Sequence, residues 1–194
     1  MVKRVFIVHR WFGSPRADWY PWLKKQLEQK GFVVHVPKMP TPNAPEIRTW
    51  VGALSKAVGL VDKETYFVGH SIGCLTILHY LESLAKGAKI GGVVFVAGWF
   101  RLSPEAMPSA KEQTIAQPWL ASDLDLDKVA KHSEKFVAML SDNDLYVPLV
   151  ENKKIFDKFA KVIVQRNKGH YDEETGVQEV PDVLKLVLEM SASV

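Results

Sequence analysis

Short apolar runs alternate with segments of helical periodicity along the whole chain, and this alternation restricts the fold more than any other feature. Six runs have the apolar, β-branched composition of buried strands. They are Lys3–Val8, Phe32–Val36, Thr65–Val68, Gly92–Ala97, Lys135–Leu140 and Lys161–Val164. Strands that are apolar on both faces and separated by helices predict a mainly parallel six-stranded sheet with right-handed crossovers.

The segments between these runs predict the covering helices. Apolar residues recur every fourth position from Trp19 to Leu27, between a candidate N-cap at Asp18 and a stop signal at Gly31. The longest connection, Phe100–Ser133, contains three prolines and is where a small cap could lie. We therefore predict one three-layer, doubly wound α/β domain over residues 1–194. The other predicted helices are Ile47–Val58, Ile72–Leu84, Val150–Phe159 and Val180–Met190.

Composition narrows the classes of function. The longest apolar stretch, Gly91–Phe100, is about half of the roughly 20 residues that a membrane-spanning helix needs, so we expect no membrane segment. A single cysteine, Cys74, excludes internal disulfides and cysteine metal clusters, and is typical of a cytoplasmic protein. The net charge of +3 comes from basic and acidic residues spread along the chain, which argues against nucleic-acid binding. No phosphate-binding glycine loop or zinc motif is present, so we expect neither cofactor nor metal.

The third predicted strand is followed by Gly-His-Ser-Ile-Gly at residues 69–73, which fits the G-x-S-x-G pattern. In this motif a sharp strand-to-helix turn exposes the serine at the carboxyl edge of the sheet, and the glycines allow close backbone packing. The alternative is an ordinary tight turn with a satisfied serine. Because the motif stands between a strand and an apolar helix, we predict that Ser71 is a nucleophile and that the backbone N–H of Ile72 is one oxyanion donor.

A serine nucleophile needs a base and a group that orients the base, and both are expected after Ser71. His170 follows the sixth strand and is the only one of the six histidines in that position. Its alternative is an exposed loop histidine. Asp142 and Asp144 both follow the fifth strand, and the residues alone leave them equal, since either could cap the next helix. The order Ser, Asp, His is that of α/β-hydrolases.

Several segments together resemble one known family. They are Val8–Pro15, Trp19–Leu23, Met39–Pro42, the elbow at 69–73, Gly91–Trp99, Ser141–Pro148 and Gly169–His170. Over almost the whole chain the sequence is similar to the small serine hydrolases of the retinoblastoma-binding protein 9 and YdeN-type family. The resemblance implies a minimal α/β-hydrolase fold without a large lid, and a small acyl substrate. It also implies a possible protein partner. It favours Asp144 as the acid, because the family's aspartate lies four residues before a proline.

The resemblance also implies that the N–H of Trp11 is the second oxyanion donor. Relatives often have His-Gly where this chain has His9 and Arg10, and glycine reaches backbone angles that arginine does not. Arg10 could bind a substrate carboxylate, or it could point into solvent. Trp99 and Tyr146 are candidates for the substrate-binding wall, although large aromatic residues also pack in cores without any such role.

Two functions follow from these observations. The first is hydrolysis of small carboxylic esters or related acyl substrates through an acyl-enzyme. The alternative is a weakly active or inactive protein-binding module on the same fold, because fold does not determine function. The complete Ser, Asp and His set favours the hydrolase, and labelling by a fluorophosphonate probe would distinguish the two.

Overall fold

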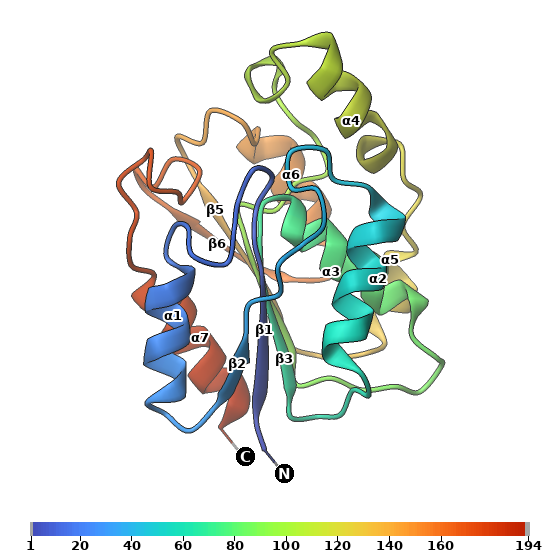
Figure 1. The fold of residues 1–194 in the computed structure, drawn as a ribbon, viewed down its shortest axis with the longest axis vertical. Helices are drawn as coiled ribbons and strands as arrows, with labels where there is room; N and C mark the ends of the chain where they lie inside the picture. Colours follow the sequence, from blue (N-terminus) through green and yellow to red (C-terminus); the bar gives the residue numbers. More distant parts are fainter. Residues whose placement is uncertain (1, 193–194) are drawn as a thin grey trace.

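The alternation folds into a six-stranded sheet in which every strand pair is parallel (Figure 1). The computed structural model describes residues 2–192. The strands of this part of the chain are β1 (Arg4–Val8), β2 (Val33–His35), β3 (Thr65–His70), β4 (Gly92–Val96), β5 (Phe136–Ser141) and β6 (Lys161–Gln165). Its helices are α1 (Tyr20–Glu28), α2 (Ile47–Val58), α3 (Ile72–Ser83), α4 (Ala110–Leu120), α5 (Leu126–Ala130), α6 (Leu149–Phe156) and α7 (Pro181–Ser191), with a short 3-10 turn, η1, at Pro104–Ala106.

The helices form a layer on each face of the sheet, because successive strand residues point to opposite faces. In β1, Val5 and Ile7 pack with the apolar residues of α1 and α7. Phe6 and Val8 pack with those of α2, α3 and α6 on the other face. Figure 1 shows α1 and α7 side by side on one side of the sheet and α2 and α3 on the other. The predicted three-layer architecture is therefore confirmed.

The strand order, β2-β1-β3-β4-β5-β6, places the site. From β1 the chain first moves outward to β2 and then returns to the opposite side of β1 as β3, so the winding reverses between β1 and β3. Parallel sheets bind ligands at such a reversal, beyond the carboxyl ends of the strands. The register pairs Val8 with Gly69, so the loop after β1 lies beside the turn after β3.

The long connection after β4 contains η1, α4 and α5, none of which the apolar periodicity indicated. Helix α4 begins with a capping box made by Ser109 and Glu112, and it lies beyond the carboxyl edge of the sheet (Figure 1). Trp119 anchors it: its indole donates to the carbonyl of Pro45 at 3.0 Å and packs edge-on against Trp50. Between residues 2 and 192, no helix is both long enough and apolar enough to span a bilayer.

Candidate active site

The turn between β3 and α3 holds Ser71 in a strained conformation. Its φ is 54° and its ψ is −122°, outside the regions that L-residues ordinarily occupy. The glycines on either side of it are required because neighbouring backbone leaves no room for a side chain. A Cβ at Gly73 would lie 2.3 Å from the carbonyl oxygen of Val8, and one at Gly69 would lie 2.8 Å from the backbone of Cys74. Only glycine lets α3 approach the ends of β1 and β3 this closely, which is the geometry of a nucleophile elbow.

Asp144 and His170 are brought together by the loops after β5 and β6. The imidazole Nδ1 lies 2.8 Å from Asp144 Oδ2, and both side chains are buried. Asp144 Oδ1 accepts the backbone N–H groups of Tyr146 at 2.9 Å and Val147 at 3.1 Å, which fixes the carboxylate. Asp142 has a different role: its Oδ1 accepts the N–H of Asn167 at 2.9 Å, in the loop that leads to the histidine. The carboxylate beside the imidazole is thus Asp144.

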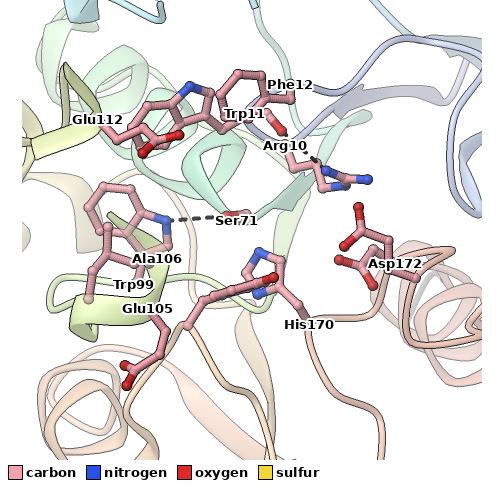
Figure 2. Close-up of a pocket in the computed structure, with 13 residues that line it drawn as sticks. Arg10, Trp11, Phe12, Ser71, Trp99, Glu105, Ala106, Glu112, His170 and Asp172 are labelled. Atoms are coloured by element: carbon pink, nitrogen blue, oxygen red, sulfur yellow. Dashed lines mark hydrogen bonds between the residues drawn. The ribbon is translucent and has the colours of Figure 1, made fainter. Parts of the chain in front are cut away.

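Ser71 and His170 line one pocket of about 290 Å³ at the carboxyl edge of the sheet. Figure 2 shows Ser71 between Trp99, His170 and the Arg10–Phe12 segment. Tyr146 adds its ring edge-on to the imidazole, with centroids 5.2 Å apart. The complete lining is Arg10, Trp11, Phe12, Ser71, Trp99, Leu102, Glu105, Ala106, Glu112, Tyr146, His170, Asp172 and Glu174. The connection after β4 therefore forms part of the wall, whereas Trp119, on α4 of the same connection, packs in the core.

Trp99 contacts Ser71 directly. Its indole Nε1–H donates to Ser71 Oγ at 3.3 Å, and the ring is 1% exposed (Figure 2). In the described part of the chain, Oγ makes its hydrogen bond with this indole and not with the imidazole of His170. A small rotation of the serine side chain or an approach of the imidazole would bring the two groups together, and such loose geometry is common in ligand-free sites.

Two backbone amides are available for an oxyanion. Among residues 2–192, the N–H groups of Ile72 and Trp11 have no protein acceptor, whereas that of Phe12 donates to Pro42 at 2.8 Å. Unpaired amides beside a nucleophile are what an oxyanion hole requires. The arginine in place of glycine causes no backbone strain at its own position, because the residues of this loop with positive φ are Phe12, at 57°, and Asp18, at 52°, and not Arg10.

The guanidinium of Arg10 forms an ion pair within the protein. Its Nε lies 2.9 Å from Oδ2 of Asp18, whose side chain is fully buried. Asp18 is consequently not the N-cap of α1, as the sequence suggested; Trp19 occupies that position without a side-chain bond. Burial alone would raise the pKa of Asp18, but that pKa lies below its usual value, and the hydrogen bond from Arg10 is the largest contribution that lowers it. Neither of the two sequence interpretations of Arg10 included this pair.

Carboxylates dominate the remaining charge around the pocket. The acidic lining residues are Glu105, Glu112, Asp172 and Glu174. Arg10 is the one cation of the lining, and it is already paired. The pocket is therefore acidic within a chain of net charge +3. Among residues 2–192, no three histidine, cysteine or carboxylate side chains gather where they could hold a metal ion.

Sequence reasoning missed two polar residues that hold the histidine loop. Asn143 Oδ1 accepts the N–H of Gly169 at 2.8 Å, and Ser141 Oγ accepts that of Lys168 at 3.0 Å. Ser141 also donates to Asn143 at 2.8 Å, so the two act as one unit. The signal available in the sequence was the run of short polar residues after the fifth strand, a composition typical of side chains that bind nearby backbone.

The fold and the site define an α/β-hydrolase: a parallel sheet with a nucleophile elbow after β3 and a buried acid and histidine pair at the same edge. The model of the serine hydrolase family matches residues 5–189, and the chain belongs to this family.

Relatives that match over most of the chain agree with this assignment. The putative hydrolase YdeN of Bacillus subtilis is 28% identical over 184 residues, which cover 94% of this chain and 93% of the relative. The serine hydrolase RBBP9 of Rattus norvegicus is 23% identical over 172 residues, or 88% and 86% of the two chains. The crystal structure of the B. subtilis ydeN gene product superimposes with a TM-score of 0.88 over 97% of this chain and 98% of the other. Est1E from Butyrivibrio proteoclasticus, at 14% identity, shares the fold with a TM-score of 0.71 over 99% of this chain and 89% of its own.

Proposed function

We propose that this serine hydrolase cleaves small carboxylic esters or related acyl substrates through a covalent acyl-enzyme, with Ser71, His170 and Asp144 as the triad. One observation carries the proposal. A serine held at φ 54° shares a pocket with a histidine whose Nδ1 is bonded to a buried carboxylate. This combination fits acyl transfer, because a hydroxyl becomes nucleophilic only when a neighbouring base removes its proton.

The proposed reaction begins with the imidazole. Donation of Nδ1–H to Asp144 leaves the lone pair of Nε2 free to accept the Ser71 proton. Oγ then attacks the substrate carbonyl, and the resulting oxyanion accepts the N–H groups of Ile72 and Trp11. The protonated His170 returns its proton to the leaving alcohol. Water, activated by the same imidazole, then releases the acid and restores the serine.

The size of the pocket supports a small substrate. A volume of about 290 Å³ lies at the lower end of the range for ligand sites, and α4 with η1 limits its extension. The rings of Trp11, Trp99 and Tyr146 give it apolar walls. These walls suit a short acyl chain, while the carboxylates disfavour a negatively charged one.

A panel of acyl esters of graded chain length, assayed on wild type and on Ser71→Ala, tests this function. The wild type is expected to hydrolyse short esters best, and the variant is expected to retain less than about one thousandth of that kcat. The kcat/KM of the wild type should rise with pH as the general base loses its proton. Equal hydrolysis by both proteins, or a rate independent of pH between about 5 and 9, would contradict the proposed mechanism.

A further inference from the structure

A directed chain of hydrogen bonds passes through His70, the residue before the nucleophile. The N–H of Arg10 donates to the hydroxyl of Tyr20 at 3.1 Å, and this hydroxyl lies 2.7 Å from Nδ1 of His70. On the other side of the ring, Nε2 lies 2.8 Å from the carbonyl oxygen of His170. A carbonyl only accepts, so Nε2 carries the proton and Nδ1 accepts the Tyr20 O–H.

Burial keeps the imidazole of His70 uncharged. His70 and Tyr20 are fully buried. Burial, together with the neighbouring His170, lowers the pKa of His70 to about 3, despite the opposing charge of Asp18, whose Oδ2 lies 4.0 Å from Nδ1. Arg10, the other charged group here, is paired with Asp18. Burial therefore favours a neutral imidazole, whose two ring nitrogens supply one donor and one acceptor.

The chain joins three of the segments on which the proposed mechanism depends. Arg10 precedes Trp11 in the loop after β1, His70 precedes Ser71, and His170 lies in the loop after β6. The ring of His170 is fixed by Asp144, and its main chain is fixed independently by His70. The ring of His70 also packs against Trp19, with centroids 5.4 Å apart. An apolar side chain could make this contact equally well, so packing does not explain why a polar residue stands here.

We propose that His70 is a positioning residue. Its Nε2–H holds the main chain of His170 in place opposite Ser71, and its Nδ1 is linked through the Tyr20 hydroxyl to the backbone of Arg10, in the loop that carries the proposed oxyanion donor Trp11. This inference rests on the proposed hydrolase function. In this role His70, the second residue of the elbow, acts through its hydrogen bonds. It does not contact substrate and takes no part in proton transfer.

A matched pair of variants isolates the donor. Glutamine can place an N–H near the position of Nε2, whereas methionine has similar length and no donor. We expect His70→Met to lose about 100-fold in kcat with KM nearly unchanged, and His70→Gln to stay within about threefold of wild type, because displacing a base by a fraction of an ångström slows chemistry more than binding. The free energy of unfolding, measured for both variants, separates this effect from loss of the fold.

Tyr20→Phe tests the other end of the chain, since it removes one hydroxyl and keeps the ring. It should lower kcat about tenfold with KM nearly unchanged, because the Nδ1 of His70 and the N–H of Arg10 both lose their partner. Tyr80→Phe is the control: that hydroxyl is buried without any hydrogen-bond partner among the described residues, on α3. Its kcat should equal that of wild type.

The outcomes separate this inference from the proposed function. Equal kcat in folded His70→Met and His70→Gln, or, if the methionine variant does not fold, unchanged kcat in Tyr20→Phe, would overturn the positioning role while leaving the hydrolase intact. A folded wild type without esterase activity would instead remove the proposed function. Nitrogen-15 NMR of the histidine rings gives a readout that needs no turnover: the proton of His70 should stay on Nε2 from about pH 5 to 9, and a proton on Nδ1 would also overturn the inference.

Discussion

Asn152 offers a sharp test of how the wall of the pocket is held. It is fully buried on α6 and makes four hydrogen bonds to backbone. Its Oδ1 accepts the N–H groups of Phe100 at 2.6 Å and Arg101 at 2.9 Å. Its Nδ2 donates to the carbonyls of Arg101 at 2.9 Å and Pro148 at 2.7 Å. The side chain thereby fixes the segment that directly follows Trp99.

Asn152→Ala removes all four bonds. Each such bond contributes about 0.5–1.5 kcal/mol, and some of the freed groups can reach water, so we expect the free energy of unfolding to fall by about 3 kcal/mol. The kcat/KM should fall as well, because the segment after Trp99 loses its anchor. Urea unfolding gives the first quantity and ester hydrolysis the second.

The control for this experiment is Lys153→Ala, at the next position on α6. The side chain of Lys153 is 43% exposed and forms an ion pair with the exposed Asp157, so its loss should change the free energy of unfolding by less than about 0.5 kcal/mol. A destabilisation below about 1 kcal/mol for Asn152→Ala would refute the reasoning, since it would mean that water replaces the amide at no cost.

Three further predictions concern the site. Trp99→Phe keeps an aromatic ring, although a smaller one, and removes the indole N–H that donates to Ser71 Oγ, so kcat/KM should fall by up to about tenfold; an unchanged value would mean that the indole bond has no part in the reaction. Because the pKa of His70 is lowered from 6.5 to about 3, the unfolded chain binds a proton in this interval that the folded protein does not, so the free energy of unfolding should decrease as pH falls. The slope from this residue is up to about 1.4 kcal/mol per pH unit, and urea titrations of His70→Gln should show a shallower dependence than wild type; equal slopes would contradict a neutral buried imidazole. Finally, the acidic lining predicts a lower KM for an ester that carries an ammonium group than for its carboxylated analogue, with the difference shrinking at high salt, whereas a preference for the carboxylate would restore a substrate role for Arg10.

The sheet could be predicted because its signal is local and repeated. All six strands were found within a few residues of their observed ends, and apolar periodicity located α2 and α3 closely. Helix α4 was missed because its surface is mostly polar and it contains Pro118; it is held by contacts such as that of Trp119 with Pro45, which are distant in sequence. Helix α5 has only five residues, too few for a periodic pattern.

The candidate site divides in the same way. Ser71 was recognisable because its motif describes a local turn, and His170 because it follows the last strand. The choice between Asp142 and Asp144 needed the family resemblance, since both stand in the same turn. The Arg10 ion pair and the hydrogen bond from Trp99 to Ser71 could not be predicted from the sequence, because each depends on how separate segments face one another after folding.

The most direct test of the central claim is active-site labelling by a fluorophosphonate, followed by mass spectrometry of the digested protein. We predict one adduct, on the peptide that contains Ser71, which is absent in Ser71→Ala and forms far more slowly in His170→Ala. Folded wild-type protein that stays unlabelled, or an adduct on another residue, would contradict the assignment of Ser71 as a nucleophile activated by His170.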